Sequence, residues 1–347
     1  MREKLLDVLI CPGCGRETWT VERRESRDSG SIERGELVCF SCRACYSIDR
    51  GIVDLLPQPD ETVLRERAGW EKFLQGASEE LDEAWILALP RIDENVSANP
   101  RSTIHWKRQA DNFFGLMELL GLRGDEKVLE LGAGRCWASA HLARMGCQVV
   151  ALDVVRSVRA GGLETGAVYL EHGTLYFERV LASMEKPPFR PGTFDLVLSV
   201  ASIHHSPLLD RVVSQCARVL RPGGRLALTS EPCTRLFGDK RVQNEETEAG
   251  INEHAYDLLD YRRAFRTAGL QAKFVLPGAV EAMLRGGEHV SGVGRMKSLL
   301  FGFTRQLWRG AWLRRTLRSQ PANLVGLLFL EYGLTAVARK PMESERR

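Results

Sequence analysis

Five of the nine cysteines in this 347-residue chain lie within its first 45 residues, at spacings that suit metal binding. Cys11 and Cys14 form one C-x-x-C pair, and Cys39 and Cys42 form a second pair across a polar loop. Two such knuckles can supply the four thiolates that tetrahedral Zn²⁺ prefers. Cys45 forms a further C-x-x-C with Cys42 and could compete for the fourth position. Because every ligand would come from the protein, the pattern predicts a structural zinc site.

A strand-and-turn motif in the middle of the chain could hold a ligand. The apolar run Lys127–Leu131 carries Glu130 and leads into the turn Gly132-Ala133-Gly134, ahead of a helical stretch. Glycine permits unusual backbone angles and a close approach of ligand, and the amides at the helix start point toward that ligand. Trp137 stands where a dinucleotide-binding G-x-G-x-x-G motif has its third glycine, which argues against NAD.

The next apolar run supports a ligand at the same turn. It spans 148–152 and is followed by Asp153, nineteen residues after Gly134. A carboxylate at that strand end can accept hydrogen bonds from both ribose hydroxyls of a nucleoside. The alternative is a solvated aspartate in a loop.

The order Glu130-x-Gly132-x-Gly134 resembles the first motif of class I S-adenosylmethionine (AdoMet) methyltransferases, in which the acid lies near the methionine end of the cofactor. The segments VLASMEKPPFRPGTFDLVLSVASIHHSP and CARVLRPGGRLALTSEP resemble the second half of the type 11 methyltransferase family. This resemblance covers about residues 105–275. It implies an AdoMet site, with Ser183 where an acid commonly holds the adenine amino group. Met184 would pack on the adenine face or simply fill the core. The expected cofactor residues are Glu130, Gly132, Ala133, Gly134, Asp153, Ser183, Met184 and Ser199.

Candidates for the transfer step follow the later strands. His204 and His205 come after the run 194–200, and Glu231 ends the run that begins at 225. Strand ends line the ligand crevice of an open α/β sheet. Methyl transfer mainly requires alignment of nucleophile and methyl group, and a base only when the acceptor is protonated. Either histidine, or Glu231, is therefore a candidate base, and positioning is the other role open to them. His254 and Tyr256 are further candidates on the substrate side.

The sequence around the cysteines shows a second resemblance. LLDVLICPGCG and LVCFSCRACYSIDRGIVDLLP resemble the small zinc-ribbon proteins that activate partner methyltransferases. The resemblance covers about the first 57 residues. It implies a ribbon fused ahead of a catalytic domain, which it binds and steadies.

The elements that must position these residues follow from hydrophobic patterning. Short apolar runs at 127–131, 148–152, 194–200 and 225–229 alternate with amphipathic stretches, as a parallel sheet covered on both faces requires. We predict a doubly wound α/β fold with a mostly parallel, seven-stranded methyltransferase sheet, an N-terminal zinc ribbon and a helical C-terminal insert. The predicted divisions are a ribbon at 1–57, a helical linker and first catalytic helices at 58–120, the cofactor-binding core at 121–277, a basic helical insert at 278–325, and a last strand and tail at 326–347.

Composition limits the partners. A formal net charge of +3 is too small to indicate a general nucleic-acid binder. No apolar run approaches the roughly 18 residues that a membrane-spanning helix needs, and clustered cysteines favour a reducing compartment, so we expect a cytoplasmic protein. The segment 295–320 holds seven Lys or Arg and no acid, interleaved with aromatic residues. It could be a lid, a peripheral membrane contact or an RNA-binding surface.

Together these patterns favour AdoMet-dependent methyl transfer to a small-molecule or lipid-linked metabolite, at an oxygen, nitrogen or carbon atom. An rRNA or tRNA methyltransferase is the first alternative. A non-catalytic scaffold that keeps the methyltransferase fold is the second. The acceptor and the oligomeric state are left open.

Overall fold

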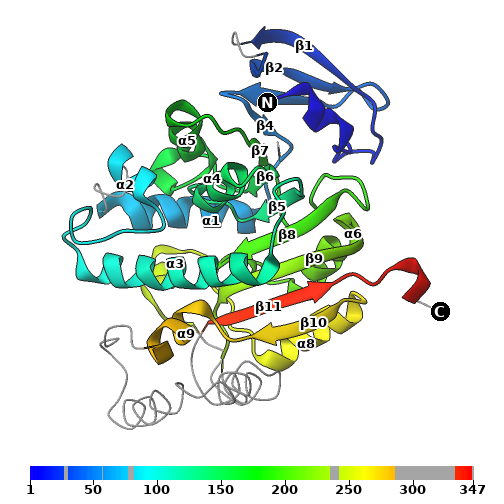
Figure 1. Ribbon diagram of the computed structural model, residues 1–347. Helices are drawn as coiled ribbons and strands as arrows, with labels where there is room; N and C mark the ends of the chain where they lie inside the picture. Colours follow the sequence, from blue (N-terminus) through cyan, green and yellow to red (C-terminus); the bar gives the residue numbers. More distant parts are fainter. Residues whose placement is uncertain (27–29, 57, 77–81, 235–241, 286–332, 346–347) are drawn as a thin grey trace.

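The computed structural model describes residues 1–26, 30–56, 58–76, 82–234, 242–285 and 333–345, and its centre is one sheet with helices on both faces (Figure 1). Over these residues the sheet has eleven strands in the order β1-β2-β3-β4-β7-β6-β5-β8-β9-β11-β10. Neighbouring strands from β7 to β9 are parallel, whereas β11 is antiparallel to both β9 and β10. These seven strands are β5 (Lys127–Leu131), β6 (Gln148–Asp153), β7 (Glu178–Leu181), β8 (Phe194–Val200), β9 (Leu220–Glu231), β10 (Gln271–Val275) and β11 (Leu334–Arg339).

The strand order fixes where a ligand can bind. From β5 the chain adds β6 and β7 on one side and then crosses to add β8 and β9 on the other. A crevice forms beyond the carboxyl ends of the strands where this reversal occurs, here between β5 and β8. Val128, Leu129 and Leu131 of β5 are all buried because helices cover both faces. The predicted doubly wound α/β class is confirmed.

The ribbon departs from the predicted arrangement, because it extends the catalytic sheet. Its strands are β1 (Trp19–Ser26), β2 (Ile32–Cys39), β3 (Cys45–Asp49) and β4 (Ile52–Asp54). Strand β4 pairs in parallel with β7, so that Ile52 lies opposite Arg179 and Val53 opposite Val180. The sheet therefore has more strands than the seven predicted. The physical reason is that β7 would otherwise be an exposed edge with unpaired backbone groups.

The two faces of the sheet carry different helices. One face packs against α2 (Glu83–Ala88), α3 (Pro100–Leu120), α4 (Trp137–Arg144) and α5 (Gly166–His172). The other packs against α6 (Leu209–Val219) and α8 (Leu258–Thr267). Alternation along β5 matches this division, since Val128 packs with the first group and Leu129 with the second. Asp60 caps helix α1 (Glu61–Phe73), because its carboxylate accepts a hydrogen bond from the Val63 amide.

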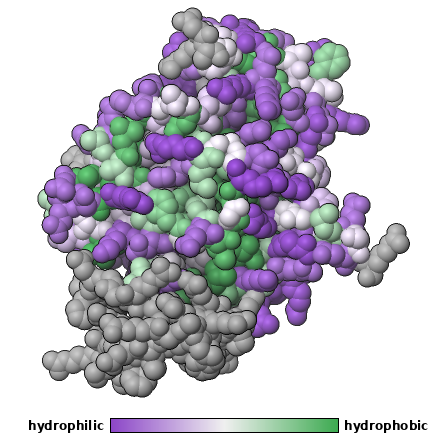
Figure 2. Space-filling view, in the orientation of Figure 1, coloured by the Kyte–Doolittle hydropathy of each residue, from purple (hydrophilic) through white to green (hydrophobic). Residues whose placement is uncertain are grey.

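Most of the predicted basic insert lies outside the described residues, including the 295–320 segment considered for membrane or RNA contact. Its described part is α9 (Gly278–Arg285), and β11 is the strand predicted near the end of the chain. None of the described helices combines the length and hydrophobicity that crossing a bilayer requires. Hydrophilic residues cover most of the face seen in Figure 2, and hydrophobic residues gather near its middle.

Candidate functional site

A cavity of about 880 Å³ lies at the carboxyl ends of the central strands. The turn after β5, the end of β6 and the segment after β8 form its floor, and α1 and residues 242–255 supply further walls. Its size falls in the range of small-molecule and cofactor sites. Seven of the eight predicted cofactor residues line it: Glu130, Gly132, Ala133, Gly134, Asp153, Ser183 and Met184.

The turn after β5 requires glycine. Gly132 and Gly134 have φ of +62° and +46°, in the left-handed region. A Cβ on Gly132 would lie 2.4 Å from the Cβ of Ser202, so a side chain there would displace that residue. Ser202 is held in place because its hydroxyl donates to the Leu131 carbonyl at 2.7 Å. The close approach of β5 to the segment after β8 thus depends on Gly132.

Two buried carboxyl groups flank this turn. Glu130 accepts a hydrogen bond from the Ser139 hydroxyl, and burial raises the pKa of Glu130 to about 8. Burial also raises the pKa of Asp153, against hydrogen bonds from the amides of Val155 and Gly134, each 2.7 Å from a carboxylate oxygen. Each carboxyl keeps acceptor capacity toward the cavity. A cationic ammonium near Glu130 and ribose hydroxyls near Asp153 would use that capacity, which fits AdoMet.

Ser199, the eighth predicted cofactor residue, lies beneath the cavity wall instead. It is fully buried, and its hydroxyl donates to Glu231 Oε1 at 2.8 Å. The amides of Ser202 and Ile203 donate to the same oxygen, at 3.1 and 3.2 Å. Glu231, a predicted catalytic residue, is likewise fully buried and acts on the cavity only through its neighbours. Its other oxygen contacts His204 Nδ1 at 2.8 Å.

The two predicted histidines differ in their surroundings. Burial alone would lower the pKa of His204, but Glu231 and Glu253 raise it to about 10. His204 Nε2 lies 3.4 Å from Glu253 Oε1. For His205, burial and the nearby His204 lower the pKa to about 4. The pair therefore combines a charged and a neutral imidazole at neutral pH, and neither has the pKa near 7 that suits a general base. A base role for either stays a prediction.

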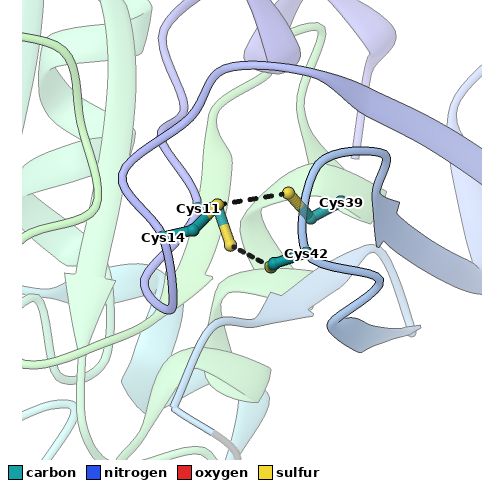
Figure 3. A group of neighbouring side chains, drawn as sticks. All are labelled: Cys11, Cys14, Cys39 and Cys42. Atoms are coloured by element: carbon teal, nitrogen blue, oxygen red, sulfur yellow. Dashed lines mark hydrogen bonds between the residues drawn. The ribbon is translucent and has the colours of Figure 1, made fainter.

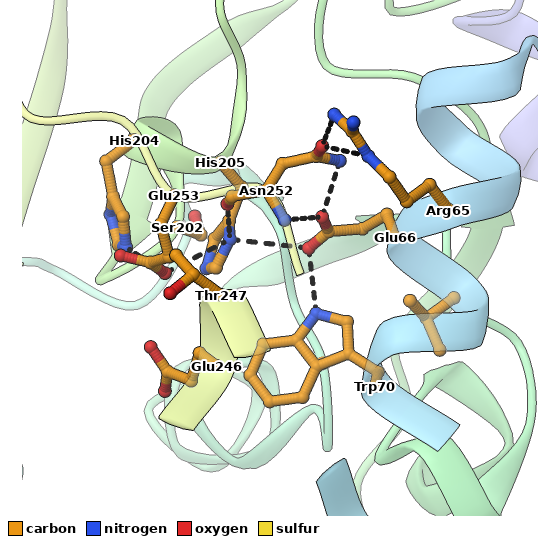
Figure 4. Close-up of polar contacts among 12 residues, drawn as sticks. Arg65, Glu66, Trp70, Ser202, His204, His205, Glu246, Thr247, Asn252 and Glu253 are labelled. Atoms are coloured by element: carbon orange, nitrogen blue, oxygen red, sulfur yellow. Dashed lines mark hydrogen bonds and ion pairs between the residues drawn. The ribbon is translucent and has the colours of Figure 1, made fainter. Parts of the chain in front are cut away.

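Sequence reasoning missed three functional candidates, which are Glu66, Asn252 and Glu253. Glu66 of α1 accepts hydrogen bonds from the Asn252 amide and side chain at 2.8 and 2.7 Å, while Trp70 donates to its other oxygen at 2.8 Å. His205 Nδ1 donates to the Asn252 carbonyl at 2.7 Å. Glu253 follows Asn252 directly in the chain. Figure 4 shows these side chains converging from α1, the segment after β8 and the stretch before α8. Only the Asn-Glu-His run at 252–254 offered a signal in the sequence.

The four knuckle cysteines meet at one point, away from the cavity (Figure 3). Cys11 Sγ lies 3.6 Å from Cys42 Sγ, and Cys14 Sγ lies 3.6 Å from Cys39 Sγ. Zn²⁺ with four bonds of about 2.3 Å gives sulfur–sulfur edges of about 3.8 Å, so the arrangement fits structural zinc. Cys45 lies outside this group and is exposed, which leaves the fourth position to Cys42.

Residues 129–228 match the family model described as a methyltransferase domain, and residues 2–51 match the model of Trm112p-like proteins. The chain carries an AdoMet-dependent methyltransferase domain. The Trm112p-like ribbon precedes it, and both resemblances stated from the sequence are confirmed.

Curated relatives match mainly in the catalytic part. A ubiquinone biosynthesis O-methyltransferase of Xanthomonas euvesicatoria is 33% identical over 118 residues, covering 33% of this chain and 45% of the relative. A sarcosine/dimethylglycine N-methyltransferase of Halorhodospira halochloris is 35% identical over 128 residues, covering 35% of this chain and 43% of the relative. The chain thus spans less than half the length of these two relatives.

Among solved structures, a complex between the Trm112 methyltransferase activator of Haloferax volcanii and a methyltransferase matches with 16% identity and a TM-score of 0.46. The match covers 75% of this chain and 97% of that chain.

Proposed function

We propose that the chain transfers a methyl group from AdoMet to a small-molecule acceptor that enters the cavity, at an oxygen, nitrogen or carbon atom. The supporting observation is the burial of the groups that would face the acceptor. The side chains of His204 and Glu253 are each 5% exposed, and that of His205 is 15% exposed. An acceptor must therefore come inside the protein to reach them, which suits a metabolite better than a folded RNA.

The geometry supports a separate role for each group of residues in the cavity. The cofactor supplies a methyl group on a sulfonium, and the chain mainly has to align an acceptor with it. Asp153 and the glycine turn hold the cofactor, with Glu130 at its methionine end. His204 is held by Glu231, and His205 by Asn252, so both imidazoles keep one orientation toward the cavity. Helix α1 and residues 242–255 line the cavity around them.

Labelled AdoMet tests the proposal directly. The protein is incubated with methyl-labelled AdoMet and either a metabolite extract filtered below about 1 kDa or total RNA from the same cells. We expect label in the filtered fraction and none in RNA. Transfer into RNA alone would favour the rRNA or tRNA alternative, and no transfer with either, despite AdoMet binding, would count against the proposal.

Asp153→Ala is the matched negative control. It removes a charged hydrogen-bond acceptor from the cavity, so AdoMet binding should weaken by roughly 1.5–3 kcal/mol, about 10- to 150-fold. Calorimetric titration measures this loss. Unchanged affinity would show that the cofactor binds elsewhere.

A further inference from the structure

Beside the cofactor residues, three side chains present metal-ligating atoms to one another. One ligand atom each from His204, His205 and Glu253 lies within 4.8 Å of the other two. The histidines come from the 3-10 helix η6 (Ile203–His205), and Glu253 from the stretch before α8. All three line the cavity. Figure 4 shows the two imidazoles and the carboxylate side by side.

Both imidazoles have one nitrogen already engaged in the way that metal ligands require. His204 Nδ1 lies 2.8 Å from the Glu231 carboxylate, and His205 Nδ1 lies 2.7 Å from the Asn252 carbonyl. A carbonyl can only accept, so His205 carries its proton on Nδ1 and keeps the lone pair on Nε2. Metal-binding histidines characteristically donate their other N–H to a carboxylate or a backbone carbonyl. Each histidine here has one such partner.

The carboxylate has an oxygen that hydrogen bonds do not satisfy. Glu253 Oε1 is buried and accepts no hydrogen bond from the described residues. It lies 3.4 Å from His204 Nε2 and 3.5 Å from His205 Nδ1. Its contact with His204 is an ion pair without a hydrogen bond, so the oxygen keeps acceptor capacity that a bound cation could use.

The charge around the cluster also favours a cation. Glu66 Oε1 lies 3.3 Å from His205 Nδ1, Glu231 contacts His204, and Glu246 lies beside Glu253. Four carboxyl groups thus surround two imidazoles in a site of low dielectric. A metal ion bound at His204 Nε2 would supply, among these carboxyl groups, the positive charge that a proton on His204 otherwise supplies.

We propose that His204, His205 and Glu253 bind one divalent first-row transition metal ion, with its open coordination positions facing the cavity. Two imidazoles and one carboxylate suit manganese, iron or zinc better than the all-oxygen sites of magnesium and calcium. Three protein ligands leave at least one position for a further ligand. That ligand is an acceptor offering one oxygen or two adjacent oxygens, such as a vicinal diol, a catechol or a hydroxy acid. The acceptor class rests on the proposed function, whereas metal binding itself does not.

Mn²⁺ is the probe that separates this site from the ribbon. The full chain is first given one equivalent of zinc, which the four thiolates of the ribbon bind in preference to the imidazole–carboxylate site. Titration with Mn²⁺, followed by electron paramagnetic resonance of the free ion, should then reveal one saturable site per chain. Glu253→Gln and His205→Gln should each weaken it by at least about tenfold, the loss that removing even an outer-shell partner produces. His172→Ala, a change to an exposed histidine at the end of α5, should leave it unchanged.

Two results would overturn the site. One is the absence of saturable Mn²⁺ binding in the wild type, and the other is equal binding in both glutamine variants. Retained ribbon zinc and AdoMet affinity in the variants show that they are folded. If only one variant folds, the comparison rests on that variant. The titration needs neither AdoMet nor an acceptor. Mn²⁺ binding without methyl transfer would therefore contradict the proposed function and still support the metal site.

Discussion

The two buried carboxyl groups beside the glycine turn, Asp153 and Glu130, differ in the hydrogen bonds that support them. Asp153 accepts two backbone amide hydrogen bonds, which favour its charged form against the effect of burial. Glu130 is supported by the hydroxyl of Ser139, and its pKa is raised to about 8. A buried carboxyl that must ionise to meet a cationic ligand destabilises the fold without that ligand. Glu130 therefore destabilises the fold without cofactor and favours cofactor binding.

The variant Glu130→Gln tests this effect. The folded-state pKa of Glu130 lies above its ordinary value of 4.5, so its contribution to stability is lost as pH rises from about 4.5 to about 8. Glutamine cannot titrate and can still accept the Ser139 hydrogen bond. Without cofactor, we expect the variant to gain on the order of 3–4 kcal/mol over the wild type between pH 5 and pH 8.

Urea unfolding at both pH values measures that gain, and calorimetry should show weaker AdoMet binding by the variant at pH 8. A wild type and variant whose stability difference is the same at both pH values would contradict the raised pKa.

At the scale of elements, α1 stands over the cavity because it is tied to the segment before α8. Arg65 Nε donates to Asn252 Oδ1 at 3.0 Å, and Glu66 accepts from the same asparagine. Gly69, one turn further along, lets the helix approach the backbone of Gly250 and Ile251. A Cβ there would lie 2.6 Å from Ile251 N and 2.8 Å from Gly250 C. Backbone atoms cannot move aside as the end of a flexible side chain can.

Gly69→Ala distinguishes this contact from ordinary helix propensity. Propensity alone would stabilise the helix by about 1 kcal/mol. Overpacking against a backbone instead predicts a loss of about 1–3 kcal/mol, and we expect the loss. Glu71→Ala, at an exposed position of the same helix, is the control and should change the free energy of unfolding by no more than about 0.5 kcal/mol. A stabilised Gly69→Ala variant would mean that α1 does not pack this closely.

At the scale of the whole molecule, the ribbon and the catalytic domain share one sheet. The hydrogen bonds between β4 and β7 make the ribbon a structural edge of the domain. The N-terminal amino group of Met1 donates to the Ile32 carbonyl, and the Arg2 amide donates to Glu178 on β7. Loss of the ribbon would uncover the β7 edge, so zinc should stabilise the chain well beyond the first 57 residues.

Cys39→Ser measures that coupling. Cys39 is fully buried and belongs to the group of four thiols, so its loss should release zinc, lower Tm and weaken AdoMet binding in the same sample. Cys45→Ser, an exposed cysteine outside the group, should keep one zinc per chain and lie within about 0.5 kcal/mol of the wild type. A Cys39→Ser variant that still binds zinc would contradict the assignment of four cysteine ligands.

The sequence by itself determined the features that depend on neighbours in the chain. The two C-x-x-C knuckles, the glycine turn after β5 and Asp153 at the end of β6 follow from spacings of a few residues and from strand and helix periodicity. Tertiary structure alone decided which distant groups meet. Glu66 reaches Asn252 across 186 residues, Ser199 turns from the cofactor toward Glu231, and β4 joins β7 to make one sheet. Local spacing does not predict these contacts, because they arise only when helices and strands from remote segments pack together.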